Sequence, residues 1–165
     1  MARKITKPNA FQKLLHRIVM IRPVTAFFAP WIHRLDKALL ELTKGKHSAA
    51  EILGWPMVEI TTIGAKTGQP RTMPLIGIVA DEKIALIASS FGREHNPGWY
   101  YNLKKHSECE VLFNGRIGKY IARELEGDEY HHYWQMAISI YAGYEKYKER
   151  AAHRHIPVML LEPKK

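Results

Sequence analysis

The stretch Ile60-Thr-Thr-Ile-Gly-Ala-Lys-Thr-Gly-Gln-Pro-Arg-Thr-Met-Pro-Leu75 contains two β-like runs on either side of a turn bounded by glycines. Short runs of this kind, limited by turn residues, predict a pair of strands. The turn offers backbone N–H groups, the hydroxyl of Thr67 and the cations of Lys66 and Arg71, a set that suits a phosphate or a carboxylate. Solvated hairpin loops often have the same composition, and the spacing is not that of a P-loop. The turn alone therefore leaves both interpretations open.

Similar short runs continue on both sides of this hairpin and predict six strands. We expect them at residues 57–63, 71–80, 83–90, 108–113, 116–125 and 156–161. The fourth and fifth flank Asn114-Gly115, a strong hairpin signal. A helix is expected over 97–106 with Asn96 as its N-cap, and one long helix from Asp128 to about Arg150. Six strands with few helical crossovers predict a mainly β (α+β) fold, an antiparallel sheet that curls into a small barrel with flanking helices.

The N-terminal part of the chain differs from this body in charge. Most of the formal net charge of +9 lies in residues 1–50, where Lys and Arg far outnumber Asp36 and Glu41. The body is therefore close to neutral, and with no nucleic-acid-binding signature we expect no nucleic-acid partner. We divide the chain into a basic helical extension, residues 1–50, and a barrel domain, residues 51–165.

The extension is predicted to be amphipathic. In a helix from about Ala10 to Arg22, apolar residues recur at i, i+3, i+4, i+7 and i+8. Such a helix lies on an anionic membrane surface, through residues 10–43, or packs on the barrel or on a second subunit. The apolar runs are too short for a leader or a membrane span, so we expect a protein that is neither exported nor membrane-spanning.

The chain has a single cysteine, Cys109. It cannot form an internal disulfide, and no close Cys/His spacing indicates a metal site. We expect no metal and a cytoplasmic location, with association on the inner face of the cell membrane if the extension binds lipid. Nothing around Cys109 marks an activated thiolate, so we expect a small strand residue there.

A second polar block is Ala88-Ser-Ser-Phe-Gly-Arg-Glu-His-Asn-Pro-Gly-Trp-Tyr-Tyr-Asn-Leu103, which reads as a strand end, a loop and a helix start. The loop can bring Ser89 and Ser90 near the first turn of the helix, whose free N–H groups attract negative charge. For the side chains of Trp99 and Tyr100 we expect a packing role in the covering helix.

Taken in order, these blocks resemble the deazaflavin-dependent nitroreductase family, split β-barrel oxidoreductases that use coenzyme F-420. The resemblance rests on Thr-Thr-x-Gly-x-Lys-[Ser/Thr]-Gly-x-Pro-Arg-x-x-Pro-Leu at 61–75, Ala-Ser at 88–89, Asn-Pro-x-Trp-Tyr-x-Asn-Leu at 96–103, Tyr-x-x-Tyr-x-x-Tyr at 141–147 and Ile-Pro-Val at 156–158. It implies an FMN-binding split-barrel-like fold. It also implies an enzyme that passes a hydride from reduced F-420 to an electron-poor acceptor such as a quinone, an enone or a nitro compound.

The resemblance further implies which residues form the site. The basic turn would hold the phosphate and glutamate tail of the cofactor, the next strand would line one side of the deazaflavin, and the second block the other. The implied cofactor-binding residues are Lys66, Thr67, Gly68, Arg71, Met73, Pro74, Leu75, Ala88, Ser89, Ser90, Pro97, Gly98 and Trp99. Tyr141, Tyr144 and Tyr147 would bound the substrate cleft. The catalytic candidates, as proton donors to the product, are Tyr141, Tyr144 and Ser89.

Two departures from the family pattern concern charge. Some members carry Arg where this chain has Ala65, and Lys where it has Ser90, so two cations that could hold the tail are missing. Arg93 is a candidate substitute for one of them. Two alternatives stay open: an FMN-dependent split-barrel oxidoreductase, and a non-catalytic binder of F-420 or lipid at the membrane surface. The sequence does not determine the oligomeric state.

Overall fold

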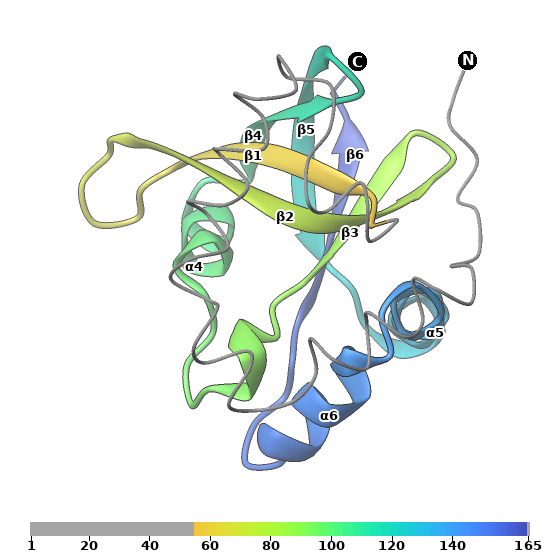
Figure 1. Cartoon of the computed structure of the whole chain (residues 1–165). Helices are drawn as coiled ribbons and strands as arrows, with labels where there is room; N and C mark the ends of the chain where they lie inside the picture. The colour runs from red at the N-terminus through yellow and green to blue at the C-terminus, as the bar shows by residue number, and fades with distance from the viewer. Residues whose placement is uncertain (1–54, 165) are drawn as a thin grey trace, which may run out of the picture. The chain divides into compact units, whose positions relative to one another are not determined.

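The computed structural model describes residues 55–164, which form a closed barrel of six antiparallel strands with three helices outside it (Figure 1). The strands are β1 (Met57–Ile63), β2 (Pro70–Ala80), β3 (Lys83–Ile87), β4 (Glu108–Phe113), β5 (Arg116–Glu124) and β6 (Val158–Pro163). Their order around the barrel is β1-β2-β3-β6-β5-β4, and pairing of β1 with β4 closes it. The six-stranded antiparallel barrel predicted from the sequence is confirmed.

Five strand boundaries differ from the prediction by one to three residues, and the largest shift is where β3 meets β6. β3 ends at Ile87 rather than Ser90, and β6 begins at Val158 rather than Ile156. Ile87 pairs with Val158, and the N–H of Ala88 still donates to the carbonyl of Pro157 at 2.9 Å. Proline has no N–H to return, so the ladder between these strands stops at this point.

The expected hairpin between β4 and β5 is confirmed. Phe113 and Arg116 pair across the turn, and Asn114 and Gly115 both have positive φ, 51° and 73°. These are the dihedrals that a two-residue turn needs to match the twist of the strands, and Asn-Gly adopts them readily.

The barrel interior is aliphatic, and α4 (Gly98–Lys105) covers part of it. Trp99 and Leu103 of α4 are buried in one cluster with residues of β1, β3, β4 and β6. The N-cap of α4 is Pro97, not Asn96 as predicted. Cys109 is buried in the same cluster, and its burial raises the pKa of the thiol to about 12. A thiol in this setting stays protonated and unreactive at neutral pH.

The prediction of one long helix from Asp128 to about Arg150 is wrong, because the segment forms α5 (Gly127–Ile140) and α6 (Gly143–Arg150). Tyr141 has an extended backbone between them, with φ −144° and ψ 99°. A side chain at Gly143 would overlap the ring of Tyr141, so the tyrosine occupies space that a continuous helix would not leave. Tyr141 and Tyr144 therefore do not share one helical face.

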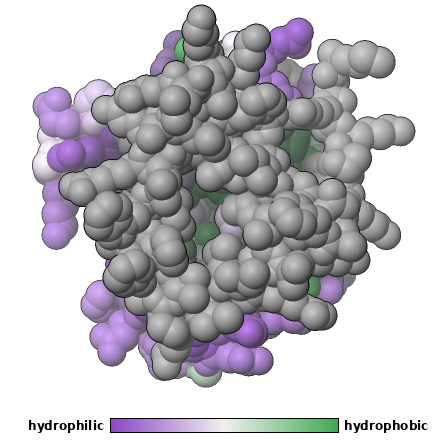
Figure 2. All heavy atoms as spheres, in the orientation of Figure 1, coloured by the Kyte–Doolittle hydropathy of each residue, from purple (hydrophilic) through white to green (hydrophobic). Residues whose placement is uncertain are grey.

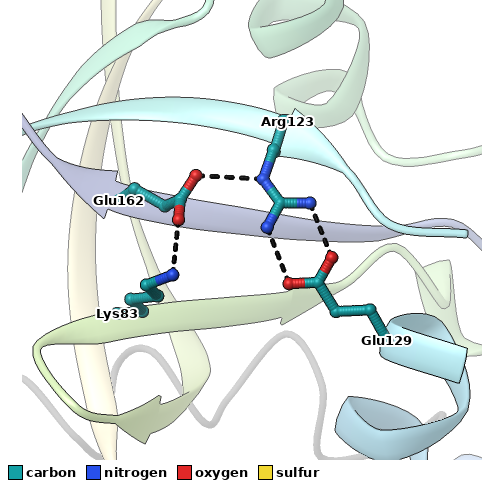
Figure 3. Close-up of polar contacts among 4 residues, drawn as sticks. All are labelled: Lys83, Arg123, Glu129 and Glu162. Carbon is teal, nitrogen blue, oxygen red and sulfur yellow. Dashed lines mark hydrogen bonds and ion pairs between the residues drawn. The ribbon is translucent and has the colours of Figure 1, made fainter.

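A network of four charged residues ties strands β3, β5 and β6 to α5 (Figure 3). Glu162 of β6 accepts from Lys83 of β3 at 2.6 Å and from Nε of Arg123 of β5 at 2.9 Å. Arg123 also donates from both terminal nitrogens to the carboxylate of Glu129 on α5, at 2.7 and 2.6 Å. These contacts hold the pKa of Glu162 and of Glu129 below the usual range. Because all four side chains are partly exposed, the network specifies geometry more than it adds stability.

The extension assigned to residues 1–50, including segment 10–43 for which membrane binding is expected, lies outside the described residues. Within the described range 55–164, no helix is both long enough and apolar enough to cross a membrane.

Candidate functional site

The turn between β1 and β2 projects from the barrel (Figure 1), and the atoms at the corresponding margin of Figure 2 are hydrophilic. Two backbone hydrogen bonds of 2.8 Å close the loop, from Gly64 N–H to Gln69 O and from Gly68 N–H to Gly64 O. The predicted anion-binding residues of this turn are all exposed to solvent: Lys66, Thr67, Gly68 and Arg71. The structure therefore presents them together on one accessible loop.

The base of this turn is attached to α4 through side chains. The Asn102 side chain accepts a hydrogen bond from Ala65 N–H at 2.9 Å and donates one to the Thr62 hydroxyl at 3.0 Å. Lys105 Nζ donates to the carbonyl of Ala65 at 2.7 Å. The sequence motif contained Asn102 without a role for it, and it did not point to Lys105. An asparagine inside a helix was the available signal, since asparagine there usually serves a specific hydrogen bond.

Three predicted residues of β2 lie on two faces of the strand. Met73 and Leu75 are partly buried and pack against the barrel core, whereas Pro74 is exposed. Neighbouring side chains of a strand point to opposite faces. A planar ring bound against β2 would therefore contact the backbone of the strand and the side chains of only one of its two faces.

The loop after β3 holds the second group of predicted residues. Ala88 and Ser89 are buried, and the next three residues form the short turn η1 (Ser90–Gly92). Ser90, Phe91 and Gly92 all have positive φ, 48°, 58° and 78°. This conformation costs roughly 1–2 kcal/mol for each residue with a Cβ. Surrounding contacts must hold such a turn in place.

Arg154 supplies these contacts, and sequence reasoning missed it. It lies between α6 and β6, and its guanidinium bridges segments about 60 residues apart in the chain. Its acceptors are the carbonyls of Ala88 (3.5 Å), Ser89 (2.9 Å), Arg93 (2.9 Å) and His155 (3.1 Å), and the side chain of Asn96. All are uncharged, so these hydrogen bonds leave the charge of the guanidinium uncompensated while it shapes the loop. Backbone acceptors leave no pattern in the sequence, which is why no motif pointed to this residue.

The Ser89 hydroxyl tests whether this loop fits a bound group. Thr62 and Ser89 are the buried residues with aliphatic hydroxyls in the described region. The Thr62 hydroxyl is bonded to Asn102 and to the Arg71 carbonyl. The Ser89 side chain makes no hydrogen bond among residues 55–164, and its hydroxyl is not one of the fully buried unsatisfied atoms of this range. Solvent therefore reaches this hydroxyl at the edge of a largely buried residue. The unbonded, accessible hydroxyl fits a ligand with polar atoms beside the loop.

The predicted tyrosines gather between α5 and α6. The hydroxyls of Tyr141 and Tyr147 lie 3.0 Å apart, and the rings of Tyr141 and Tyr144 pack with centroids 5.4 Å apart. Phe91 of the strained turn packs edge-on against Tyr147 at 5.9 Å. Burial raises the pKa of all three tyrosines above the usual value. The structure thus joins the tyrosines to the loop that carries Ser89.

Trp99 and the start of α4 complete the set. Trp99 is 3% exposed and lies in the core cluster, as expected for a packing residue. Pro97 is partly buried and Gly98 is exposed. No side chain caps the first turn of α4: the Tyr100 N–H donates to the Pro97 carbonyl at 3.0 Å, and the N–H groups of Gly98 and Trp99 stay available to a ligand. Residues 55–164 contain no group of three His, Cys, Asp or Glu side chains placed to hold a metal ion.

A closed antiparallel barrel with a cationic turn, an accessible serine hydroxyl and an aromatic cluster fits a split-barrel redox protein that takes an anionic, ring-bearing cofactor. The family model for F420H(2)-dependent quinone reductases matches residues 31–163, and the chain belongs to this family. It is accordingly an F-420-dependent oxidoreductase that passes a hydride from the reduced deazaflavin to an electron-poor acceptor. The expected deazaflavin cofactor and enzymatic role are confirmed.

Relatives of known name agree with this assignment. The chain is 30% identical over 131 residues to an F420H(2)-dependent quinone reductase of Mycobacterium tuberculosis and to a putative one of Mycobacterium bovis. Each alignment covers 78% of this chain and 87% of the relative.

Solved structures agree as well. The F420-H2 dependent reductase FDR-A superposes with a TM-score of 0.60 at 37% identity, covering 65% of this chain and 94% of that one. A second structure, described as a domain-swapped dimer, has a TM-score of 0.62 at 34% identity, covering 81% and 98%. The Vibrio cholerae protein HutZ, at 10% identity and a TM-score of 0.52, covering 67% of this chain and 82% of that one, shares the fold alone.

Proposed function

We propose that the protein reduces quinones, with the F-420 tail at the β1–β2 turn and the deazaflavin between β2 and the loop after β3. The observation that carries this proposal is the position of α4. Its C-terminal half binds the turn through Asn102 and Lys105, and its N-terminal residue Gly98 follows the Ser89 loop. One helix of eight residues, about 12 Å long, therefore connects the proposed tail site at the turn with the proposed ring site at the Ser89 loop.

The residues of the site divide by position. We assign the F-420 tail to the exposed β1–β2 turn, and the deazaflavin ring to β2 and the loop after β3. Trp99 supports the ring site from the barrel core. The tail residues are Lys66, Thr67, Gly68 and Arg71; the ring residues are Met73, Pro74, Leu75, Ala88, Ser89, Ser90, Pro97 and Gly98. Backbone N–H groups and cations suit the charged end, and partly buried side chains suit the ring.

The chain's own residues orient the acceptor and exclude water. Reduced F-420, when bound, supplies the hydride. Tyr141, Tyr144 and Tyr147 bound the acceptor side. Because burial raises the pKa of Tyr141 and Tyr144, both hydroxyls stay protonated at neutral pH and can donate hydrogen bonds. The same shift makes them poor general acids, since catalytic acids work best with a pKa near the operating pH.

We assign proton delivery to the product to solvent water that the Ser89 hydroxyl orients, because a serine hydroxyl is itself a weaker acid than a tyrosine, and acceptor orientation to the tyrosines. Tyr144→Phe is then expected to raise KM for the quinone while kcat keeps its pH profile. Ser89→Ala is expected to lower kcat. A changed pH profile in Tyr144→Phe with an unaffected Ser89→Ala would reverse the assignment.

Titration of the protein with oxidised F-420 tests the cofactor site. The oxidation of reduced F-420 is then measured with a panel of quinones, enones and nitro compounds, which tests the acceptor. Lys66→Gln is expected to weaken F-420 binding, and Lys146→Gln on α6 serves as a control because Lys146 is exposed and remote in sequence. Equal binding of FMN, or preference for a nitro compound over every quinone, would contradict the proposal.

We also propose that residues 10–43 bring the cytoplasmic protein to the inner face of the cell membrane, where lipid-soluble quinones reside. The support is the basic, amphipathic sequence of this segment. Deletion of residues 1–30 is expected to reduce co-sedimentation with anionic liposomes, most strongly at low salt, and to leave F-420 binding intact. Unchanged sedimentation would refute membrane binding without affecting the cofactor site.

A further inference from the structure

Two adjacent lysines end α4 and have different partners. Lys104 Nζ lies 3.0 Å from the carboxylate of Glu124, which also accepts from the Tyr100 hydroxyl at 3.0 Å. Lys105 instead donates to the Ala65 carbonyl in the β1–β2 turn. It forms no ion pair with any residue in the part of the chain that the structure describes. The charge of Lys104 is compensated, and the charge of Lys105 is not.

The turn that Lys105 reaches already carries uncompensated charge. Residues 64–71 contain Lys66 and Arg71 but no Asp or Glu. Neither cation forms an ion pair within residues 55–164, whereas Lys83, Lys104, Arg123 and Lys164 do. Three unpaired cations around one loop attract a multiply charged anion.

The contact with Ala65 also leaves Lys105 able to bind more. An ammonium has three N–H donors, and the carbonyl of Ala65 takes one of them. Ala65 is the position at which the family pattern allows arginine. The ammonium of Lys105 therefore lies where that charge is missing, held by a backbone contact that fixes its location without neutralising it.

We propose that Lys105 is the third cation of the anion site at the β1–β2 turn and binds the phosphate or the glutamate carboxylates of the F-420 tail. This inference rests on the tail site proposed above and adds to it a residue from α4, outside the turn. Asn102 shapes the loop, and Lys105 brings charge to it from the same helix.

The test compares Lys105→Gln with Lys104→Gln. Both substitutions remove a charge from the last turn of α4, so both lose the same interaction with the helix dipole. Binding is followed by fluorescence with three probes: full F-420, its phosphate-bearing form without glutamates, and the deazaflavin riboside with neither group. Thermal unfolding of each variant is measured alongside.

Lys105→Gln is expected to weaken binding of full F-420 by about two- to fivefold at low salt, the effect of one exposed charge pair. Lys105→Arg should restore it. The difference should vanish at ~1 M salt, where the screening length is only ~3 Å. The riboside should bind both variants and the wild type equally. A loss already present with the glutamate-free form assigns Lys105 to the phosphate, and one seen with full F-420 alone assigns it to the carboxylates.

Three results would overturn the inference. Full F-420 could bind Lys105→Gln as tightly as wild type, Lys104→Gln could lose as much affinity, or the riboside could lose affinity in parallel, which would indicate a structural role. If wild-type protein fails to bind F-420 at all, the tail site itself is refuted, and this outcome is distinct from the other three.

Discussion

The two loops that flank the proposed site are built in opposite ways. The β1–β2 turn is exposed, carries unpaired cations, and is attached to α4 by three hydrogen bonds at its base. The loop after β3 begins buried, has three successive residues of positive φ, and is held by the guanidinium of Arg154. The difference indicates separate tasks. A solvated charged tail tolerates an adjustable loop, whereas a reacting ring requires fixed geometry.

The largest effect is expected from Arg154→Met, which removes the group that holds the strained loop. Several carbonyls would lose a charged donor, and we expect a loss of about 3 kcal/mol in the free energy of unfolding and weaker F-420 binding. Urea denaturation measures the first and fluorescence titration the second. Arg154→Lys should not restore stability, because a single ammonium cannot reproduce the guanidinium fork.

Arg93→Gln is the matched control for this loop. The Arg93 guanidinium lies 6.0 Å from the Phe91 ring and forms no ion pair among the described residues, so its loss should cost little. Equal destabilisation by Arg93→Gln and Arg154→Met would show that the loop is not held by Arg154 in particular.

Matched glycine substitutions compare the two loops directly. Gly92 (φ 78°) and Gly68 (φ 67°) both need the left-handed backbone, but a Cβ at Gly92 would lie 2.6 Å from Arg150 Cβ, whereas one at Gly68 would meet nothing within 4 Å. We expect Gly68→Ala to cost about 1 kcal/mol and Gly92→Ala about 3 kcal/mol, since overpacking is added to the same backbone strain. If thermal unfolding shows equal losses of stability for the two variants, the loop after β3 adapts to an added side chain as readily as the β1–β2 turn does.

Asn102→Ala tests the attachment of the turn. The substitution leaves Ala65 N–H without its acceptor, and we expect a cost of about 1–2 kcal/mol together with weaker binding of full F-420. The riboside that lacks phosphate and tail should bind unchanged. Gln69→Ala is the control, because Gln69 is exposed and its side chain makes no hydrogen bond among residues 55–164. Loss of riboside binding in Asn102→Ala would show that the turn and the ring site are not independent.

The smallest effect, absent at neutral pH, is expected at Cys109, opposite Thr62 on the barrel wall below the turn. Burial raises the pKa of this thiol to about 12, from about 8.5 in an unfolded chain. Between these values the unfolded chain loses a proton that the folded chain keeps. Stability therefore falls as pH rises, by up to ~1.4 kcal/mol per pH unit from this group.

Urea denaturation from about pH 7.5 to about pH 9, where few tyrosines of the unfolded chain are ionised, measures this fall in stability. Cys109→Ala should flatten it while costing little at neutral pH. An unchanged slope would mean that water reaches the thiol, and that the barrel is open beneath the turn.

Local sequence predicted much of the barrel and only part of the site. Strand limits at Met57–Ile63 and Glu108–Phe113 matched, because alternation and turn residues act over a few positions. The break at Tyr141 was not predictable, since it depends on a ring filling the space beside Gly143. Arg154 and Lys105 were missed for a related reason. Their acceptors are backbone carbonyls distant in sequence, and every residue type offers a carbonyl.

The position of β6 has a consequence for biogenesis. β6 lies between β3 and β5, so the last of the six strands to be synthesised is the one that completes the sheet. On the ribosome, β1 to β5 can form hairpins but leave two unpaired edges, and such edges favour association with other chains. Arg154 immediately precedes this strand and leaves the ribosome just before it. The loop proposed to hold the cofactor ring is thus among the last parts of the described chain to take shape, and ligand binding should report on completed folding in newly made protein.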